Sequence, residues 1–202
     1  MIPVHGRRIH KQELETPALI VDLDIMERNI AAMAEAARAS GISLRPHVKT
    51  HKVPAIAHKQ MAAGAVGICC ATLGEAEVMV AAGLPDILVT RAVVGRSKVE
   101  RLCALSRQSR LSVVTDSVEN VDELGAAAEE LGVVLDVLLE VNVGQNRCGV
   151  EPASAQALTV ARRIAGHKAL RFAGIQGYEG HLVLIADEAE RTGKTRVANA
   201  AG

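Results

Sequence analysis

Short apolar runs alternate along the chain with segments of helical period. Seven runs rich in β-branched residues predict strands, and they cover residues 17–23, 44–49, 66–71, 87–90, 111–115, 135–143 and 170–178. In the intervening segments, apolar residues recur every three or four positions, as on one face of an amphipathic helix. Strands that alternate with helices are typical of βα units in a parallel sheet. The pattern therefore predicts an α/β fold.

Helix-boundary residues flank most of the predicted helices. A capping residue followed three positions later by Glu, or a proline at the first helical position, marks a helix start. The predicted starts are Asp24 with Glu27, Pro54, Thr72 with Glu75, and Asp116 with Glu119. Gly41, Gly64 and Gly83 are expected to end three of the helices, because glycine readily adopts the left-handed conformation that often follows a helix.

The spacing of the units favours a barrel. From the second strand onward the βα units repeat at roughly 20 to 25 residues, as in a (β/α)8 barrel of the TIM type. The competing fold is a doubly wound open sheet, but no Gly-x-Gly-x-x-Gly or Walker motif follows any predicted strand. Because a complete barrel takes about 250 residues, we expect the 202 residues to form an incomplete barrel. It would contain about six of the eight units.

Composition and charge narrow the class of partner. The chain is 49% hydrophobic with a mean hydropathy of +0.19, and 23 basic residues balance 23 acidic ones. Balanced charge, with only one Phe and one Tyr to stack on bases, favours neither nucleic acid nor an anionic membrane as partner. No apolar run reaches the ~18 residues of a membrane span, and the N-terminus lacks an apolar signal-peptide region. We expect a cytoplasmic protein with a small-molecule ligand.

The four cysteines, at positions 69, 70, 103 and 148, form no Cys-x-x-Cys pair. This spacing argues against a zinc knuckle and against a disulfide framework. Cys69 and Cys70 lie inside an apolar run, and we expect them to be small buried hydrophobic residues. No metal site is predicted from these residues.

Lys49 carries the most specific chemistry. It lies in the run Arg-Pro-His-Val-Lys-Thr-His-Lys at 45–52, at the end of a predicted strand. Like-charge repulsion and desolvation in a barrel mouth both favour the neutral, nucleophilic form of a lysine amine, which Schiff-base chemistry requires. Alternate residues of a strand share a face, so Arg45, His47 and Lys49 are expected to point the same way. The other interpretation of this run is a solvated basic loop.

Two further segments place polar groups after predicted strands. Residues 143–149 form a glycine-bracketed loop that contains Arg147, and residues 174–181 form a glycine-rich exit that contains Gln176 and Tyr178. Each alone is also compatible with an ordinary turn. Glu140 is our candidate counter-charge for Arg45, and the alternative is that Arg45 reaches solvent.

Taken together, these motifs resemble the D-threonine aldolase and D-serine dehydratase family. The resemblance rests on residues 45–52, Gly-Ile-Cys-Cys at 67–70 with Glu75-Ala76, Val-Val-Gly at 93–95, Glu-Val-Asn-Val-Gly-Gln-Asn-Arg-Cys-Gly-Val at 140–150 and Phe-Ala-Gly-Ile-Gln-Gly-Tyr at 172–178. That family belongs to the alanine-racemase-like, fold type III pyridoxal-phosphate enzymes. Thr90-Arg91 and Tyr178-Glu179 depart from its pattern, which has Asn-Glu and Tyr-His there.

The resemblance implies roles for individual residues. Lys49 would form the internal aldimine with pyridoxal 5'-phosphate, Arg147 would face the cofactor's phenolic oxygen, and Gln176 and Tyr178 would also contact the cofactor. His47 and His51 are candidate proton carriers, or else structural histidines whose hydrogen bonds are satisfied.

The resemblance also implies an organisation for the whole protein. Residues 1–41 would form a strand and helix leading into the barrel, and 42–202 the partial barrel. The strand 17–23 would pack on a C-terminal β-domain that this chain lacks. The ligands of a divalent metal would lie outside the chain, and the whole protein would be a homodimer.

The implied function is that of a pyridoxal-phosphate-dependent lyase acting on D-configured β-hydroxy-α-amino acids. It would be either an aldolase that releases glycine and an aldehyde or a dehydratase of the D-serine type. Two alternatives remain at this point. One is a non-catalytic pyridoxal-phosphate-binding homeostasis protein, and the other is an inactive truncated fragment.

Overall fold

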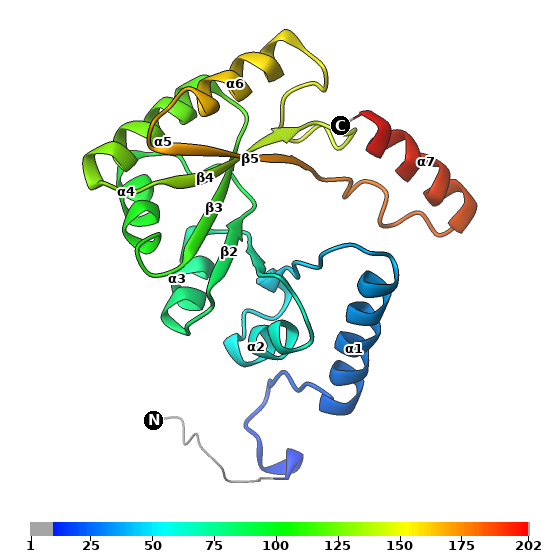
Figure 1. Ribbon diagram of the computed structural model, residues 1–202. Coiled ribbons are helices and arrows are strands. Elements are labelled where there is room, and N and C mark those ends of the chain that lie inside the picture. Colours follow the sequence, from blue (N-terminus) through cyan, green and yellow to red (C-terminus); the bar gives the residue numbers. More distant parts are fainter. Residues whose placement is uncertain (1–9, 202) are drawn as a thin grey trace.

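A parallel sheet forms the centre of the molecule (Figure 1). The structure is a computed structural model that describes residues 10–201, so residues 1–9 of the predicted N-terminal segment lie outside it. Its five strands follow one another in chain order, and each pairs in parallel with the next. They are β1 (Ile68–Cys70), β2 (Asp86–Val89), β3 (Arg110–Thr115), β4 (Leu135–Val141) and β5 (Leu170–Gly177).

Helices connect the strands and cover the outer face of the sheet (Figure 1). The helices are α1 (Leu23–Ala39), α2 (Pro54–Ala62), α3 (Leu73–Ala81), α4 (Arg96–Leu105), α5 (Val118–Leu131), α6 (Ala155–Ala165) and α7 (Glu188–Ala201), with short 3-10 helices η1 (Lys11–Glu13) and η2 (Val48–Thr50). Of these, α3 to α6 pack side by side and enclose the core with the strands. This is the α/β arrangement of a partial barrel, as predicted. None of the described helices is both long and apolar enough to cross a membrane.

The core follows from the alternation of side chains along each strand. In β2, Ile87 and Val89 are fully buried against the helices, whereas Asp86 and Leu88 face the inner side and are half-buried. Leu102 in α4 and Leu124 in α5 are fully buried on the opposing surface. Burying such a side chain stabilises the fold by about 1.5–3 kcal/mol, so this outer layer carries most of the hydrophobic stabilisation.

Two of the predicted strands do not form. Residues 17–22 have no regular structure, and α1 begins directly after them. Residues 44–47 run beside β1 and contribute one bridge, between His47 and Cys69, before the chain turns into η2. Pro46 cannot donate a backbone hydrogen bond, and the far side of this segment has no neighbouring strand among residues 10–201. The pairing therefore stays too short to count as a strand.

Helix starts are predicted correctly in two of four cases. Pro54 is the first residue of α2, and Thr72 accepts the Glu75 backbone N–H at 3.2 Å to cap α3. The predicted caps Asp24 and Asp116 are wrong, because Asp22 caps α1 through Ile25 N–H and Ser117 caps α5 through Asn120 N–H. Each wrongly predicted cap lies within two residues of the side chain that caps the helix in the structure. Both side chains are of types that cap helices well, so sequence spacing alone cannot tell which one does.

The predicted helix ends are correct to within two residues. Gly41, Gly64 and Gly83 each follow the last turn of a helix and have φ values of 66°, 110° and 81°. These positive values lie outside the range that other residues adopt readily.

Candidate functional site

A cavity of about 420 Å³ opens at the carboxyl ends of the strands. This is the edge at which barrel folds place their functional groups, and the volume lies in the range of small-molecule sites. The cavity is lined by Arg45, His47, Lys49, Cys69, Ala71, Thr90, Arg91, Arg147, Gln176, Gly177 and Tyr178. It therefore brings together five of the six predicted site residues, all except His51. None of the described residues that line it is acidic.

Lys49 lies in η2, and not at a strand end as predicted. The fully buried Val48 anchors this turn, while Lys49 itself is exposed. The Lys49 Nζ atom lies 5.6 Å from the centroid of the Tyr178 ring, and the Arg147 Cζ atom lies 5.0 Å from the same centroid. Both distances are within the range of cation–π attraction. An amine, a guanidinium and a phenol thus meet at one point, although they come from three separate segments.

His47 is hydrogen-bonded at both ring nitrogens. Its Nδ1 atom accepts the Lys49 backbone N–H at 3.2 Å, and its Nε2 atom lies 3.2 Å from Thr90 Oγ1. Thr90 Oγ1 in turn lies 3.2 Å from the Cys70 carbonyl oxygen, to which it donates. Because a backbone N–H can only donate, Nδ1 is unprotonated and Nε2–H points to Thr90. Burial and then the charge of Lys49 lower the pKa of His47, which favours this neutral ring.

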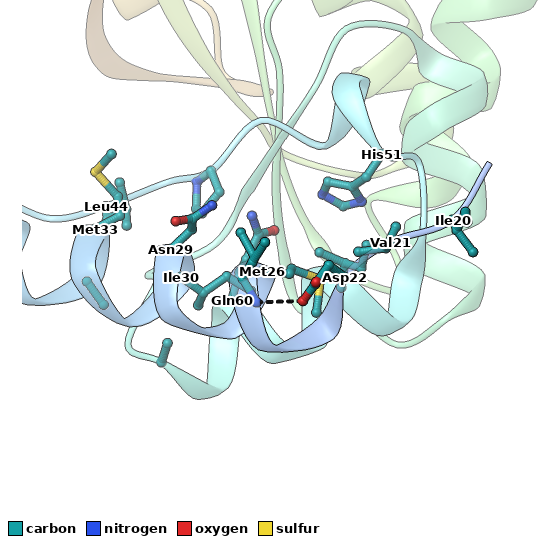
Figure 2. A pocket seen from close by; sticks show the side chains of 15 residues that line it. Ile20, Val21, Asp22, Met26, Asn29, Ile30, Met33, Leu44, His51 and Gln60 are labelled. Carbon is teal, nitrogen blue, oxygen red and sulfur yellow. Dashed lines mark hydrogen bonds between the residues drawn. The ribbon is translucent and has the colours of Figure 1, made fainter. Parts of the chain in front are cut away.

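His51 lies in a different cavity. Its Nδ1 atom accepts the Val53 backbone N–H at 3.0 Å, and its Nε2 atom is buried without a hydrogen-bond partner among residues 10–201. Burial lowers the pKa of His51. As Figure 2 shows, the ring faces an apolar groove of about 640 Å³ between α1 and the segment 44–63. Although His51 directly follows η2, its side chain does not line the cavity that contains Lys49.

Arg45 pairs with Asp86, so the predicted pair with Glu140 is wrong. Its Nη1 atom lies 2.7 Å from Asp86 Oδ1. His47 is opposite Cys69, so Arg45 is level with Gly67 and the start of β2, at the opposite end of the sheet from Glu140. A Cβ atom at Gly67 would collide with the Arg45 guanidinium. The glycine therefore lets the arginine cross its strand, a contact that the sequence analysis missed.

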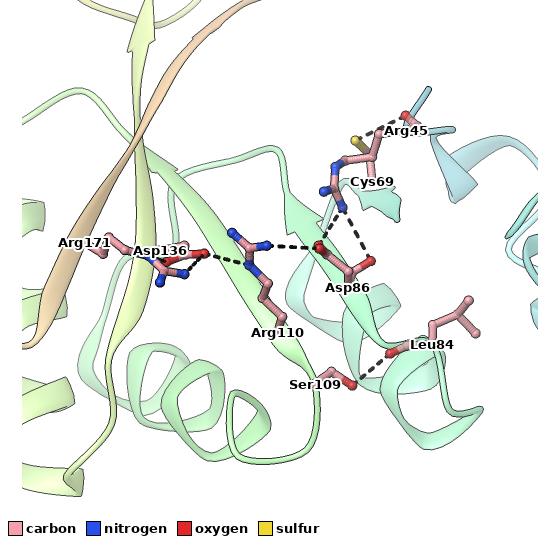
Figure 3. A network of polar contacts seen from close by, with 8 residues as sticks. All are labelled: Arg45, Cys69, Leu84, Asp86, Ser109, Arg110, Asp136 and Arg171. Atoms are coloured by element: carbon pink, nitrogen blue, oxygen red, sulfur yellow. Dashed lines mark hydrogen bonds and ion pairs between the residues drawn. The ribbon is translucent and has the colours of Figure 1, made fainter. Parts of the chain in front are cut away.

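The Arg45–Asp86 pair begins a row of ion pairs beneath the cavity (Figure 3). Along the amino ends of the strands, charges alternate in the order Arg45, Asp86, Arg110, Asp136 and Arg171. Asp136 is 3% exposed and accepts from Arg171 at 2.5 and 2.7 Å and from Arg110 at 3.0 Å. Burial alone would raise the pKa of Asp136, but the hydrogen bonds from both arginines outweigh it and lower the pKa.

The cysteines match the expectation only in part. All four are free, and Cys70 and Cys103 are buried, whereas Cys69 is half-buried at the cavity and Cys148 is exposed. Burial raises the pKa of Cys69 to about 11 and that of Cys70 to about 12, so both are neutral thiols at pH 7. Among residues 10–201, no group of three His, Cys, Asp or Glu side chains could hold a metal ion.

Comparison with known proteins identifies related chains. The model of the family "Alanine racemase, N-terminal domain" matches residues 21–200. A D-threonine aldolase of Arthrobacter is 40% identical over 185 residues, which is 92% of this chain and 48% of that protein. The crystal structure of D-threonine aldolase from Filomicrobium marinum is 45% identical with a TM-score of 0.91, over 93% of this chain and 50% of the other.

A dehydratase is also among the similar structures. D-threo-3-hydroxyaspartate dehydratase from Delftia is 33% identical with a TM-score of 0.86, over 94% of this chain and 50% of that one. The chain thus spans about half the length of each of these relatives.

Proposed function

Because the chain belongs to the family of alanine racemase N-terminal domains, we propose that it forms the cofactor-binding barrel of a pyridoxal-phosphate-dependent lyase. The substrates would be D-configured β-hydroxy-α-amino acids. One observation carries the proposal: Lys49 and Arg147 both lie against the ring of Tyr178, inside a cavity at the carboxyl ends of the strands. The names of the relatives support the substrate class, since they are aldolases and a dehydratase of such amino acids.

The residues present fit pyridoxal phosphate. The cofactor is a planar, anionic aldehyde, and the cavity offers cationic side chains, no described acidic lining and an aromatic ring. The Lys49 amine would bind the aldehyde of the cofactor, and the Arg147 guanidinium would face the phenolic oxygen of the cofactor. Gln176 and Tyr178 would add an amide and a phenol as hydrogen-bonding groups. When bound, the cofactor supplies an electron sink for bond cleavage at the substrate's α-carbon.

The chain's own residues divide the remaining work. Lys49 is the exposed amine in the cavity and can carry a proton to or from a bound substrate. His47 accepts the Lys49 backbone N–H at Nδ1, a hydrogen bond that protonation of this nitrogen would break. We therefore propose that His47 positions η2 in its neutral form. His51 faces the α1 groove and does not line the cavity that contains Lys49.

The aldolase and dehydratase reactions stay as two branches of the proposal. A divalent metal, which the resemblance implies for both, would need ligands other than residues 10–201.

For the whole protein we propose a homodimer that acts on a small D-amino acid and is located in the cytoplasm. Residues 1–41 would lead into the barrel formed by 42–202.

A labelling experiment tests the cofactor site on this chain. The protein is incubated with pyridoxal phosphate, the linkage is reduced with borohydride, and the labelled peptide is identified by mass spectrometry. We expect the label on Lys49 and a fall to background in Lys49→Arg. Lys52→Arg is the matched control, because Lys52 is three residues away, exposed and paired with Glu75 at 3.4 Å. A label on Lys52 or Lys59, or labelling that Lys49→Arg leaves unchanged, would contradict the proposal.

A further inference from the structure

Thr90 connects the central sheet to the turn that carries Lys49. It directly follows β2 and lines the cavity of the proposed site. Its backbone N–H and its hydroxyl both donate to the Cys70 carbonyl oxygen, at 2.9 and 3.2 Å. The backbone of Thr90 thus continues the pairing of β2 with β1, and the hydroxyl hydrogen is already used. The hydroxyl oxygen of Thr90 is therefore left as an acceptor.

This acceptor faces the ring of His47. The Nε2 atom of His47 lies 3.2 Å from Thr90 Oγ1. His47 pairs with Cys69 on the other side of β1, so this contact joins the two neighbours of β1 across that strand. Because the hydroxyl hydrogen goes to Cys70, the Nε2 atom is the donor. The neutral ring then has its lone pair at Nδ1, where it accepts the Lys49 backbone N–H at 3.2 Å.

The hydrogen bond at Nδ1 caps the start of η2. His47 is the N-cap residue of this 3-10 helix, and the bond that its side chain accepts comes from Lys49. η2 is only three residues long, so its backbone depends on the cap and on the fully buried Val48. The direction of the imidazole ring therefore affects where the Lys49 backbone lies.

The other charged groups that act on His47 do not hold its Nε2 atom. Burial and the charge of Lys49 lower the pKa of His47, and the charge of Glu75 opposes them. The Glu75 carboxylate accepts the Ala71 N–H at 2.7 Å and pairs with Lys52 at 3.4 Å. Within residues 10–201, the Thr90 hydroxyl is the only side-chain group that is hydrogen-bonded to the His47 ring.

We propose that Thr90 is a positioning residue for Lys49: its hydroxyl oxygen accepts the Nε2–H of His47 and so keeps Nδ1 directed at the Lys49 backbone. The proposal rests on the proposed function only in the use made of Lys49, which is to bind the cofactor. The hydrogen bonds themselves join residues of this protein alone and can be tested without any cofactor.

Amide hydrogen exchange at Lys49 tests these hydrogen bonds. Thr90→Val replaces the hydroxyl by a methyl group of similar size. We expect the Lys49 amide to exchange about three- to tenfold faster in Thr90→Val than in the wild type, the change expected for the loss of one hydrogen bond. Thr90→Ser should exchange like the wild type, because serine keeps the hydroxyl. Unchanged exchange in Thr90→Val, or equally fast exchange in Thr90→Ser, would overturn the proposal.

Thr115→Val is the matched control. Thr115 ends β3 and donates its hydroxyl to the Ser117 carbonyl oxygen at 3.4 Å, but it does not line the cavity. This variant loses the same hydroxyl at the next strand end and should leave exchange of the Lys49 amide unchanged. If Thr115→Val and Thr90→Val accelerate that exchange equally, the positioning role is refuted. Far-UV circular dichroism shows whether each variant is folded, and Thr90→Ala decides the question if Thr90→Val is not.

A double-mutant cycle tests whether Thr90 acts through His47. In the borohydride experiment, half-maximal labelling of Lys49 in Thr90→Val should need about three- to tenfold more pyridoxal phosphate than in the wild type. In a His47→Ala background the same substitution should cause no further change, because the ring that Thr90 holds is gone. Equal losses in both backgrounds would refute the route through His47.

The two readouts separate this inference from the proposed function. If wild-type Lys49 is never labelled, the proposed function fails while amide exchange still tests Thr90. If Lys49 is labelled at the same cofactor concentration in the wild type and in Thr90→Val, the positioning role is refuted and the proposed function stands.

Discussion

The sheet with α3 to α6 and the segment 10–47 with α1 have similarly apolar sequences but very different packing. In the first region, Ile87, Val113 and Val137 are fully buried between strands and helices. In the second, Leu19 is fully exposed and Ile20 is 70% exposed, although the apolar run 17–23 in which they lie predicts a strand. Apolar pattern alone therefore does not decide burial. What differs is the presence of a neighbouring strand or helix to pack against.

The same contrast runs through the functional site. Arg147 and Tyr178 lie in the loops that follow β4 and β5. The pairing of these two strands fixes where both loops begin. Lys49 lies in a segment that is held by one bridge to β1, one backbone hydrogen bond from Val66 to Leu44, and the buried side chain of Val48. The site thus joins a rigid half to a less strongly held half. Tests that compare matched positions in the two regions measure this difference.

The largest expected effect is a matched pair of isoleucine truncations. Ile87→Ala removes a fully buried side chain from β2 and should cost about 2–5 kcal/mol of unfolding free energy through lost burial and a cavity. Ile42→Ala makes the same substitution at a residue that is 65% exposed and should lower the unfolding free energy by less than about 0.5 kcal/mol. Urea unfolding of both variants measures the difference. Equal losses would show that the two regions are packed alike.

The packed region is also where sequence patterns predict the structure well. The five strands from 66–71 onward are confirmed with ends shifted by up to two residues, because each is an apolar run between helices of clear period. The strands 17–23 and 44–49 were predicted by the same criterion and are wrong, because a strand also needs a partner that no local pattern reveals. Arg45, His47 and Lys49 were expected to share one face of a strand, and all three line one cavity although Lys49 lies in η2 and not in a strand.

Contacts between strands were the part that the sequence could not predict. The choice between Asp86 and Glu140 as partner of Arg45 depends on register, and register depends on which residues pair across β1. A glycine at 67 was a usable signal, since a missing side chain often marks a close approach. The position of His51 depends on how α1 packs against residues 44–63, which is a tertiary contact of the less well packed region.

The second prediction concerns two paired aspartates. Asp136 is buried between Arg110 and Arg171, whereas Asp122 in α5 pairs with Arg163 in an exposed site. Asp136→Asn weakens the hydrogen bonds from both arginines and should lower the unfolding free energy by about 1–2 kcal/mol. The loss stays this small because both arginines are exposed and solvent screens their charge. Asp122→Asn should cost no more than about 0.5 kcal/mol.

The pH dependence gives the sign of the Asp136 effect. The folded protein lowers the pKa of Asp136, so the stabilisation is present above the unfolded value of about 3.9 and is lost as the pH falls through the lower folded pKa. The difference in stability between the wild type and Asp136→Asn should therefore be constant from pH 7 to about pH 5 and shrink below about pH 4. Thermal unfolding across this range measures it. A difference that grows towards acid pH would show that the carboxyl is not held in its charged form.

The smallest expected effect concerns two helix caps, one in each region. Asp22 caps α1 at 3.0 Å from Ile25 N, and Ser117 caps α5 at 3.2 Å from Asn120 N. Alanine at either position should cost its helix about 1 kcal/mol. In Ser117→Ala this loss should appear in global unfolding, because α5 is part of the core and buries Val121 and Leu124. In Asp22→Ala it should appear only as local opening of α1, since Ala37 is the only buried residue of that helix.

Amide hydrogen exchange distinguishes these two outcomes. In Asp22→Ala the α1 amides should exchange about fivefold faster than in the wild type, with α5 protection and the global transition unchanged. Asp22→Asn is the matched control, because asparagine caps a helix about as well as aspartate and should keep the protection of α1. If Asp22→Ala lowers protection equally in α1 and α5, the two regions unfold as one cooperative unit. In that case the exposed apolar residues of segment 10–47 do not mark a separately opening part of the molecule.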